Sequence, residues 1–268
     1  MKLAVSNIAW DEPEQPAVLA SFAELGVTGV EVAPTKLWPD WVGANPDAAL
    51  VVRRDMEARG LRVPAIQSVL FGRPDLQVFG NADSRRDLVT HLAAVARVAG
   101  ALGAAAIVFG SPRNRDRGAL SLAQAMDRSV DVLRAVGDAC AASGTCLCLE
   151  PNPEIYNCNF LTHWQDVAEL AERVGHPGVG VHLDTACIDL SGDDVVEAIE
   201  ECGAAVRHFH ISEPALGGFS NPVIDHRRVG AALRGSGYAG FVSIEMRRQS
   251  DPVASIREAV VYALTHYD

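Results

Sequence analysis

Four residues that can bind a metal ion stand at the ends of short apolar runs in the second half of the chain. They are Glu150, Asp184, His210 and Glu245, which close the runs 146–150, 179–184, 206–210 and 241–245. Three carboxylates and an imidazole at neighbouring strand ends would repel or desolvate one another without compensation, and a divalent cation is the simplest compensation. We therefore predict one metal site to which all four side chains contribute from the same structural position.

The ligand types narrow the choice of metal and suggest its chemistry. Oxygen ligands with one imidazole suit Mn²⁺, Mg²⁺, Co²⁺ or Fe²⁺, whereas structural zinc sites usually recruit thiolates. Such an ion could hold a substrate carbonyl and an adjacent hydroxyl, acidify the C–H bond between them and stabilise the enediolate that forms. We predict a single divalent ion, with Mn²⁺ as the first choice and Mg²⁺, Co²⁺, Fe²⁺ and Zn²⁺ left open.

Glu150 and Glu245 are the predicted acid/base pair, because they come from separate strands and could face opposite sides of the reacting carbon. One would remove the proton and the other would return it, each contributing roughly 10²–10⁴-fold to the rate. Return to the opposite face gives epimerisation, and return to the neighbouring carbon gives aldose–ketose isomerisation. The sequence leaves both open for a sugar, keto-sugar or cyclitol substrate.

The elements that must position these residues alternate along the chain. Continuous apolar runs are typical of parallel strands that helices cover on both faces. Earlier strands are predicted at 2–7, 29–32, 63–68 and 105–109, and helices at 13–25, 47–58, 84–102 and 121–143. Later helices are predicted at 162–174, opened by a capping box at Thr162, and at 193–202, 226–234 and from 251 onward. About eight repeats without a linker predict that residues 1–268 form one (β/α)8 TIM barrel, with its chemistry at the carboxyl ends of the strands.

Composition limits the class of partner. Of the 268 residues, 49% are hydrophobic, which is ample for a large core, and no run of about 18 apolar residues or signal-peptide pattern is present. The net charge of −11 disfavours nucleic-acid and anionic-membrane binding. The six cysteines contain no CxxC pair and are interpreted as reduced thiols. We therefore predict a cytoplasmic enzyme that acts on a small molecule, with no nucleic-acid or membrane partner.

The motifs around the four ligands resemble those of a known family. They are Leu149-Glu150-Pro151-Asn152-Pro153, His182-Leu183-Asp184-Thr185, His208-Phe209-His210 and the segment 237–245. They resemble the xylose isomerase-like TIM barrels, in particular the sugar phosphate isomerase/epimerase group that includes ketose 3-epimerases. The resemblance implies one catalytic divalent metal on Glu150, Asp184, His210 and Glu245, proton transfer by the two glutamates, and a homo-oligomer such as a dimer or tetramer.

The chain departs from that group at three substrate-binding positions. Ketohexose epimerases of this kind usually carry a Glu soon after the first metal Glu, a His three residues beyond the metal Asp and an Arg six beyond the metal His. Here these positions hold Tyr156, Cys187 and Leu216. The departures argue against a free ketohexose as substrate, although they leave proton transfer at the metal untouched.

Other residues are candidate substrate contacts. They are Tyr156, His182, His208, Arg113 and Arg247. His182 and His208 share strand faces with ligands, so they could bind substrate hydroxyls, support the ligands or be satisfied core histidines. Arg113, Arg115 and Arg117 could recognise a phosphate or carboxylate, or form a solvated loop. Arg247 would face inward if its strand continued. The Trp38 and Trp41 loop could stack on a sugar, pack on another subunit or cover the core edge.

Three other functions stay open at this stage. The same metal chemistry could drive β-elimination, as in a dehydratase or a deglycosidase of oxidised glycosides. A hydrolase of the apurinic endonuclease kind shares the barrel but needs several metals and more histidines on early strands, where this chain offers Glu31, Gln67 and Ser68. A non-catalytic metal-binding protein is the last alternative.

Overall fold

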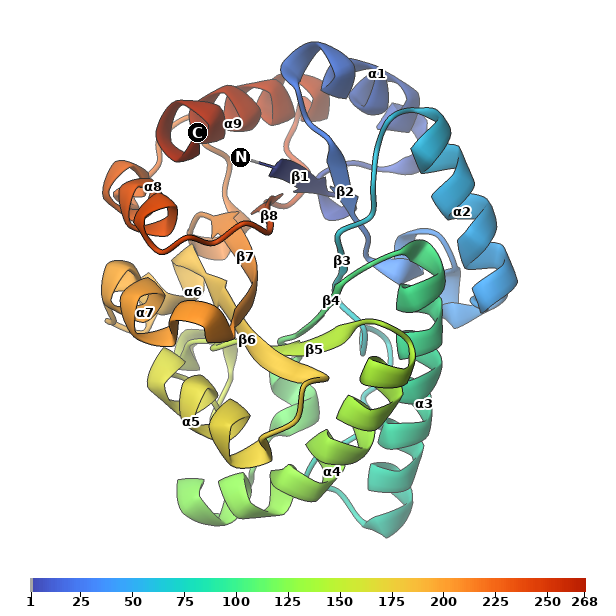
Figure 1. Ribbon diagram of the computed structural model, residues 1–268, viewed down its shortest axis with the longest axis vertical. Coiled ribbons are helices and arrows are strands. Elements are labelled where there is room, and N and C mark those ends of the chain that lie inside the picture. The colour runs from blue at the N-terminus through green and yellow to red at the C-terminus, as the bar shows by residue number, and fades with distance from the viewer. Residues whose placement is uncertain (1) are drawn as a thin grey trace.

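The computed structural model describes residues 2–268 and shows parallel strands around a common axis with helices outside them (Figure 1). The strands are β1 (Lys2–Ser6), β2 (Gly29–Glu31), β3 (Ala65–Ile66), β4 (Ala106–Phe109), β5 (Cys146–Leu149), β6 (Val179–Asp184), β7 (Val206–Ser212) and β8 (Phe241–Glu245). The helices are α1 (Gln15–Leu25), α2 (Pro46–Ala58), α3 (Ala82–Leu102), α4 (Leu122–Ala142), α5 (Trp164–Val174), α6 (Thr185–Leu190), α7 (Val195–Cys202), α8 (His226–Gly235) and α9 (Pro252–Tyr267).

The strand order closes the sheet almost completely. It runs β2-β1-β8-β7-β6-β5-β4-β3, and every neighbouring pair within it is parallel. Between β2 and β3, isolated bridges join Gly29 to Arg62 and Val32 to Ile66, which closes the ring. The predicted (β/α)8 TIM barrel is thereby confirmed.

Two apolar clusters fill the barrel and its shell. The larger cluster lies between the strands and the surrounding helices, and it includes Leu88, Leu92 and Val95 from one face of α3. A small cluster inside the barrel consists of Ala65, Ala106, Cys146 and Cys148. Because Cys148 lies two residues before Glu150, the apolar filling of the barrel gives way to polar side chains at the carboxyl ends of the strands.

Local differences from the predicted elements have physical causes. β3 covers only two residues of the predicted 63–68, because Pro64 has no N–H to donate to a neighbouring strand. The predicted capping box at Thr162 is wrong: α5 begins at Trp164, and its N-cap His163 makes no side-chain capping bond. Nδ1 of His163 instead lies 2.9 Å from Oδ2 of Asp193. The segment between Asp184 and the helix predicted at 193–202 forms a further helix, α6.

The tryptophan loop covers the edge of the core. Trp38 and Trp41 are partly buried and pack against the larger cluster, and the ring of Trp41 meets His91 edge-on at 4.8 Å between centroids.

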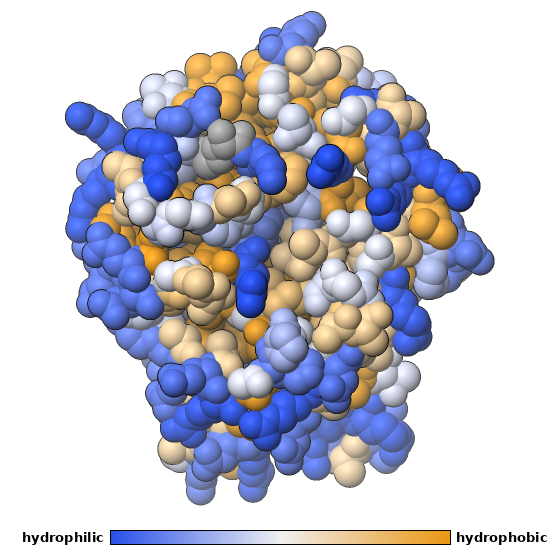
Figure 2. All heavy atoms as spheres, in the orientation of Figure 1, coloured by the Kyte–Doolittle hydropathy of each residue, from blue (hydrophilic) through white to orange (hydrophobic). Residues whose placement is uncertain are grey.

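All six cysteines are free and buried. None of the helices within residues 2–268 has the combination of length and apolar composition that crossing a bilayer requires. Hydrophilic residues gather around the rim of the face seen in Figure 2, over the outer helices.

Candidate metal centre

The structure brings the four predicted ligands together at one point. Glu150 directly follows β5, Asp184 and Glu245 end β6 and β8, and His210 lies within β7. Nδ1 of His210 lies 3.3 Å from Oε2 of Glu245, 3.6 Å from Oδ2 of Asp184 and 4.0 Å from Oε1 of Glu150. One imidazole nitrogen therefore faces three carboxylates at the carboxyl ends of neighbouring strands.

The four residues do not occupy one level, which corrects the prediction of equal positions. β7 continues to Ser212, so His210 lies two residues before its end. Asp184 pairs with His210, whereas His210 pairs with Ser243 and Glu245 pairs with Ser212. Closing a sheet into a barrel staggers its strands, so residues that meet in space need not share a position within their strands.

Glu31 orients the histidine. It ends β2, is fully buried, and its Oε1 lies 2.8 Å from Nε2 of His210 while its Oε2 lies 2.6 Å from Nε2 of His208. A carboxylate accepts hydrogen bonds, so Nε2 of His210 carries a hydrogen, and Nδ1 is the nitrogen that faces the three other carboxylates and can bind a metal ion once it has lost its proton. The sequence analysis did not assign this role to Glu31, although an acid ending an apolar strand was the available signal.

The cluster has an unmet demand for positive charge. Oδ1 of Asp184 accepts hydrogen bonds from the backbone N–H of Cys187 at 2.7 Å and from Oγ of Ser212 at 2.8 Å. Oδ2 of Asp184 and Nδ1 of His210 are buried and have no hydrogen-bond partner among residues 2–268. Burial alone would lower the pKa of His210, but the Glu31 and Glu245 carboxylates raise it well above its usual range. This donor set fits a divalent cation.

Replacing Glu31 with Gln should weaken metal binding about 10–100-fold, the usual effect of losing an outer partner of a ligating histidine. The Gln amide has the size of the Glu31 carboxylate but only one acceptor oxygen, whereas His208 and His210 each need an acceptor. Titration of the metal-free protein with Mn²⁺, followed by calorimetry, measures the effect. Glu24→Gln, on the exposed side of α1, is the control, and equal affinity in the two variants would contradict the assigned role.

Glu150 is held by a buried chain of hydrogen bonds. Nδ2 of Asn152 donates to Oε2 of Glu150 at 3.0 Å, and Nη2 of Arg115 donates to Oδ1 of Asn152 at 3.0 Å. Arg115 is fully buried and also lies 3.4 Å from the Phe109 carbonyl. Because a guanidinium only donates, Arg115 fixes which end of the Asn152 amide faces Glu150. Arg115, considered above as an anion contact, is thus turned into the protein.

Gly110 leaves the space that the Glu150 carboxylate occupies. A Cβ built at Gly110 would overlap Oε2 of Glu150. We expect Gly110→Ala to displace this carboxylate and to lower any proton transfer by about 10²-fold, the cost of a misplacement near 1 Å. Gly235→Ala is the matched control, because a Cβ there meets no atom within 4 Å. Unchanged hydrogen exchange from substrate in Gly110→Ala would show that Glu150 is not so confined.

The pH dependence of metal binding should follow Glu245. In the metal-free protein, burial raises the pKa of Glu245 to about 7, against the opposing effect of His210. The metal needs both the Glu245 carboxylate and an unprotonated Nδ1 of His210, so below pH 7 the proton on Glu245 adds its own competition with the metal. As the pH drops below 7, we expect metal affinity to fall by up to about tenfold per pH unit for each proton that the metal must displace. Calorimetry in buffers of different ionisation enthalpy measures the released protons, and affinity that is flat across this range would contradict the expectation.

A cavity of about 370 Å³ opens over the centre. Its lining consists of Gln67, Ser68, Val108, Gly110, Ser111, Pro112, Glu150, Asn152, Tyr156, Cys187, Ala215, Leu216 and Glu245. The three positions that depart from the ketohexose epimerase pattern, Tyr156, Cys187 and Leu216, therefore all face this space. Glu150 and Glu245 face it as well.

The predicted substrate contacts are distributed unequally around this cavity. Tyr156 lines it, and its hydroxyl accepts a hydrogen bond from the backbone N–H of Ala215 at 2.8 Å. His182 is buried with Nε2 3.2 Å from Oε1 of Glu150, and one atom each of Glu150, His182, Asp184 and His210 lie within 4.8 Å of one another. His208 is committed to Glu31. Arg113 and Arg247 are exposed and are not among the lining residues.

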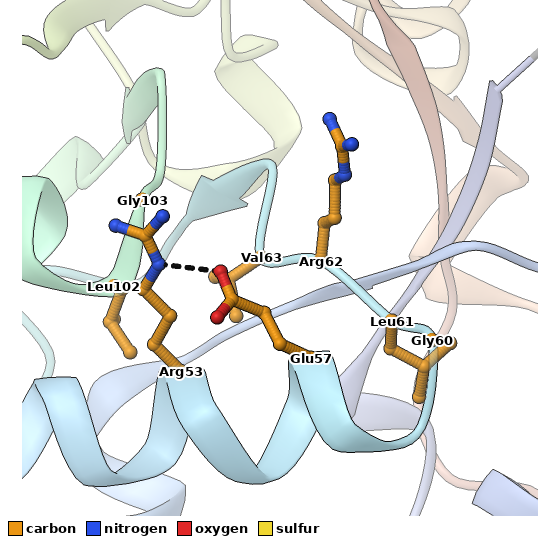
Figure 3. A pocket seen from close by; sticks show the side chains of 8 residues that line it. All are labelled: Arg53, Glu57, Gly60, Leu61, Arg62, Val63, Leu102 and Gly103. Carbon is orange, nitrogen blue, oxygen red and sulfur yellow. Dashed lines mark hydrogen bonds and ion pairs between the residues drawn. The ribbon is translucent and has the colours of Figure 1, made fainter.

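A second cavity lies near the amino end of β3 (Figure 3). Its volume is about 550 Å³, and it is lined by Arg53, Glu57, Arg62 and neighbouring residues at the ends of α2 and α3. Nε of Arg53 is paired with Oε1 of Glu57 at 2.7 Å. Although this cavity is larger, no cluster of metal-binding groups found within residues 2–268 lies in it, and the chemistry of TIM barrels occurs at the opposite, carboxyl face.

Comparison with known proteins assigns the chain to a family. The family model described as "Xylose isomerase-like TIM barrel" matches residues 19–263. The chain belongs to the xylose isomerase-like TIM barrel family. The family resemblance noted in the motifs from Glu150 to Glu245 is thereby confirmed.

Similar proteins include xylose isomerase-like barrels that are sugar epimerases. A D-psicose 3-epimerase of Ruminiclostridium cellulolyticum is 30% identical over 119 residues, which cover 44% of this chain and 40% of the relative. A ketose 3-epimerase of Arthrobacter globiformis is 29% identical over 90 residues, 34% of this chain and 31% of the relative. The matched segments span less than half of these relatives. A solved D-psicose 3-epimerase with D-tagatose from Clostridium cellulolyticum shares the fold, with a TM-score of 0.80 over 100% of both chains at 18% identity.

Proposed function

We propose that this protein is a divalent-metal-dependent epimerase or isomerase of a sugar or sugar derivative. The ion would be held by Glu150, Asp184, His210 and Glu245, with Mn²⁺ as the expected metal. When bound, it would draw electron density from a substrate carbonyl and so make the adjacent C–H bond acidic. A homo-oligomeric state and a cytoplasmic location belong to the same proposal, on the family resemblance and the composition.

The observation that carries the proposal is the placement of two glutamates around one cavity. Glu150 reaches the centre from the end of β5 and Glu245 from the end of β8, and both line the cavity. We assign removal of the substrate proton to one carboxylate and its return to the other, with the roles exchanged in the reverse direction. The amide of Asn152 holds the Glu150 carboxylate in place. The side chains of Glu150 and Glu245 are 10% and 13% exposed, so a proton taken up by either carboxylate can exchange with solvent between turnovers.

The test is exchange of a substrate C–H hydrogen with deuterated water. The metal-loaded protein is incubated in D₂O with keto-sugars and their glycosides, and mass spectrometry follows incorporation at the carbon next to the carbonyl. We expect incorporation together with an epimerised or isomerised product, and its loss when a chelator removes the metal. Loss of water or of an aglycone instead would assign the site to a lyase, and metal binding with no exchange in any compound would overturn the proposal.

A further inference from the structure

We propose that the cavity over the metal centre takes an uncharged sugar that carries an apolar substituent, such as a deoxy carbon or an aglycone, in preference to a phosphorylated or fully hydroxylated sugar. The inference rests on the proposed function and specifies its substrate class. It is drawn from the charge, the hydrogen bonding and the wall composition of the cavity.

The cavity offers no cation to an anionic substrate. Its lining within residues 2–268 contains no Lys, Arg or His, and its two charged members are Glu150 and Glu245. Even a divalent ion would leave the three carboxylates of the centre with a net negative charge. A phosphate group is usually met by arginine or by a helix N-terminus, and here it would meet acids instead.

The arginines near the cavity are either engaged in hydrogen bonds or lie outside its lining. Arg115 is fully buried and donates to Asn152 and to the Phe109 carbonyl. Arg117 donates to backbone carbonyls, with Nε 2.6 Å from that of Asn159. Arg113 and Arg247 are exposed and lie outside the lining. A charged group on the substrate would therefore have to leave the cavity to find a partner.

Part of the cavity lining is apolar. It consists of Val108, Pro112, Cys187, Ala215 and Leu216, which we call the apolar wall. The Cys187 side chain is buried, and its sulfur lies 3.5 Å from Nδ2 of Asn152. Hydroxyl groups pressed against such a wall would lose their water without gaining partners, whereas a methyl or aryl group would gain contact.

The polar lining groups are already partly engaged. Nε2 of Gln67 donates to Oγ of Ser6 at 2.7 Å, and Oε1 of Gln67 lies 3.3 Å from Oγ of Ser68. The Asn152 amide is shared between Arg115 and Glu150. Besides the hydroxyls of Ser111 and Tyr156, few lining side-chain groups thus remain for the hydroxyls of a sugar away from the reacting carbons.

The apolar wall is held in a defined position. Ala215 and Leu216 both have left-handed backbone angles, with φ of 57° and 53°, which side-chain-bearing residues adopt only when their surroundings impose it. The Ala215 N–H donates to the Tyr156 hydroxyl at 2.8 Å, and the Leu216 carbonyl accepts from the Arg247 N–H at 2.9 Å. This anchoring keeps Leu216 against the cavity, so the preference is built into the fold.

The first experiment compares three matched compounds on the Mn²⁺-loaded full chain. They are fructose, 6-deoxyfructose and fructose 6-phosphate, and phenyl 3-ketoglucoside is added as a probe that carries an aglycone. Deuterium incorporation gives kcat/KM, and calorimetry gives binding. We expect the kcat/KM of the deoxy or phenyl compound to exceed that of fructose by about tenfold, which is the effect of about one to two buried methylene groups. We expect the kcat/KM of the phosphate to be lower than that of fructose. Tighter binding of the phosphate, or fastest turnover of fructose itself, would overturn the inference. Preferential binding of the deoxy or phenyl compound without any exchange would overturn the proposed function and leave this inference standing.

A pair of variants tests the wall directly. Leu216→Arg places a cation in the cavity and should reverse the order of deoxy and phosphate compounds by more than about tenfold in binding. Val223→Arg adds the same charge on the same loop, but at a side chain that is 73% exposed, and should leave the order unchanged. If Leu216→Arg fails to fold, Cys187→His is the alternative and should favour fructose over the deoxy compound. An unchanged order in a folded wall variant, or the same reversal in Val223→Arg, would contradict the assignment.

Discussion

Substituting Gln for both Glu150 and Glu245 should reduce C–H exchange from substrate by at least about 10⁴-fold, because each carboxylate contributes roughly 10²–10⁴ as a proton-transfer group. Each single variant should show a large part of this loss, since proton removal and proton return are both required in a complete turnover. The two effects should not add, because the residues act on one reaction coordinate and both contact the metal centre. Full turnover in the double variant would end the proposal that this site transfers protons.

Metal occupancy must be measured alongside, because both glutamates are proposed ligands. Elemental analysis and Mn²⁺ titration separate a loss of metal from a loss of proton transfer: a variant saturated at high metal concentration that still does not exchange hydrogen has lost the acid or base. Glu154→Gln is the matched control for Glu150→Gln, because Glu154 is an exposed acid in the loop that follows Glu150. It should leave both metal binding and exchange unchanged.

Changing Asp184 to Asn should weaken metal binding by more than about 100-fold, beyond the roughly 10–100-fold that loss of an outer partner costs. The substitution preserves shape, and the amide oxygen can still accept from Ser212 and from the Cys187 N–H. The substitution removes the negative charge of the Asp184 carboxylate. Its Oδ2 has no hydrogen-bond partner among the described residues and lies 3.6 Å from Nδ1 of His210. The expected result is a folded protein that binds metal poorly and has little exchange activity.

Circular dichroism and thermal unfolding establish that the Asp184→Asn protein is folded before its metal affinity is compared. Asp189→Asn, at an exposed position on helix α6, which Asp184 caps, carries the same chemical change away from the centre. Equal metal affinity in the Asp184 and Asp189 variants would remove Asp184 from the ligand set. Loss in both would point to the helix rather than the carboxylate.

The fold could be predicted well from the chain because its signals are local. Apolar runs ending in polar residues, and helices with one apolar stripe such as Leu88, Leu92 and Val95, alternate along the whole sequence. Boundaries were less predictable where a single residue decided them. Pro64 shortened β3, and the bond between His163 and Asp193 connects two residues 30 positions apart, which no local pattern reveals.

The sequence alone determined which residue types gather at the carboxyl ends of the strands, because side-chain periodicity and strand order follow from local pattern. Only the tertiary structure decided how they meet. The stagger of the barrel brings Glu245 to His210 from a different level, Glu31 orients that histidine across 179 positions of sequence, and Arg115 turns inward while Arg113 stays in solvent. These contacts join strands far apart in the chain, and their geometry depends on barrel closure and on where burial leaves a charge without water.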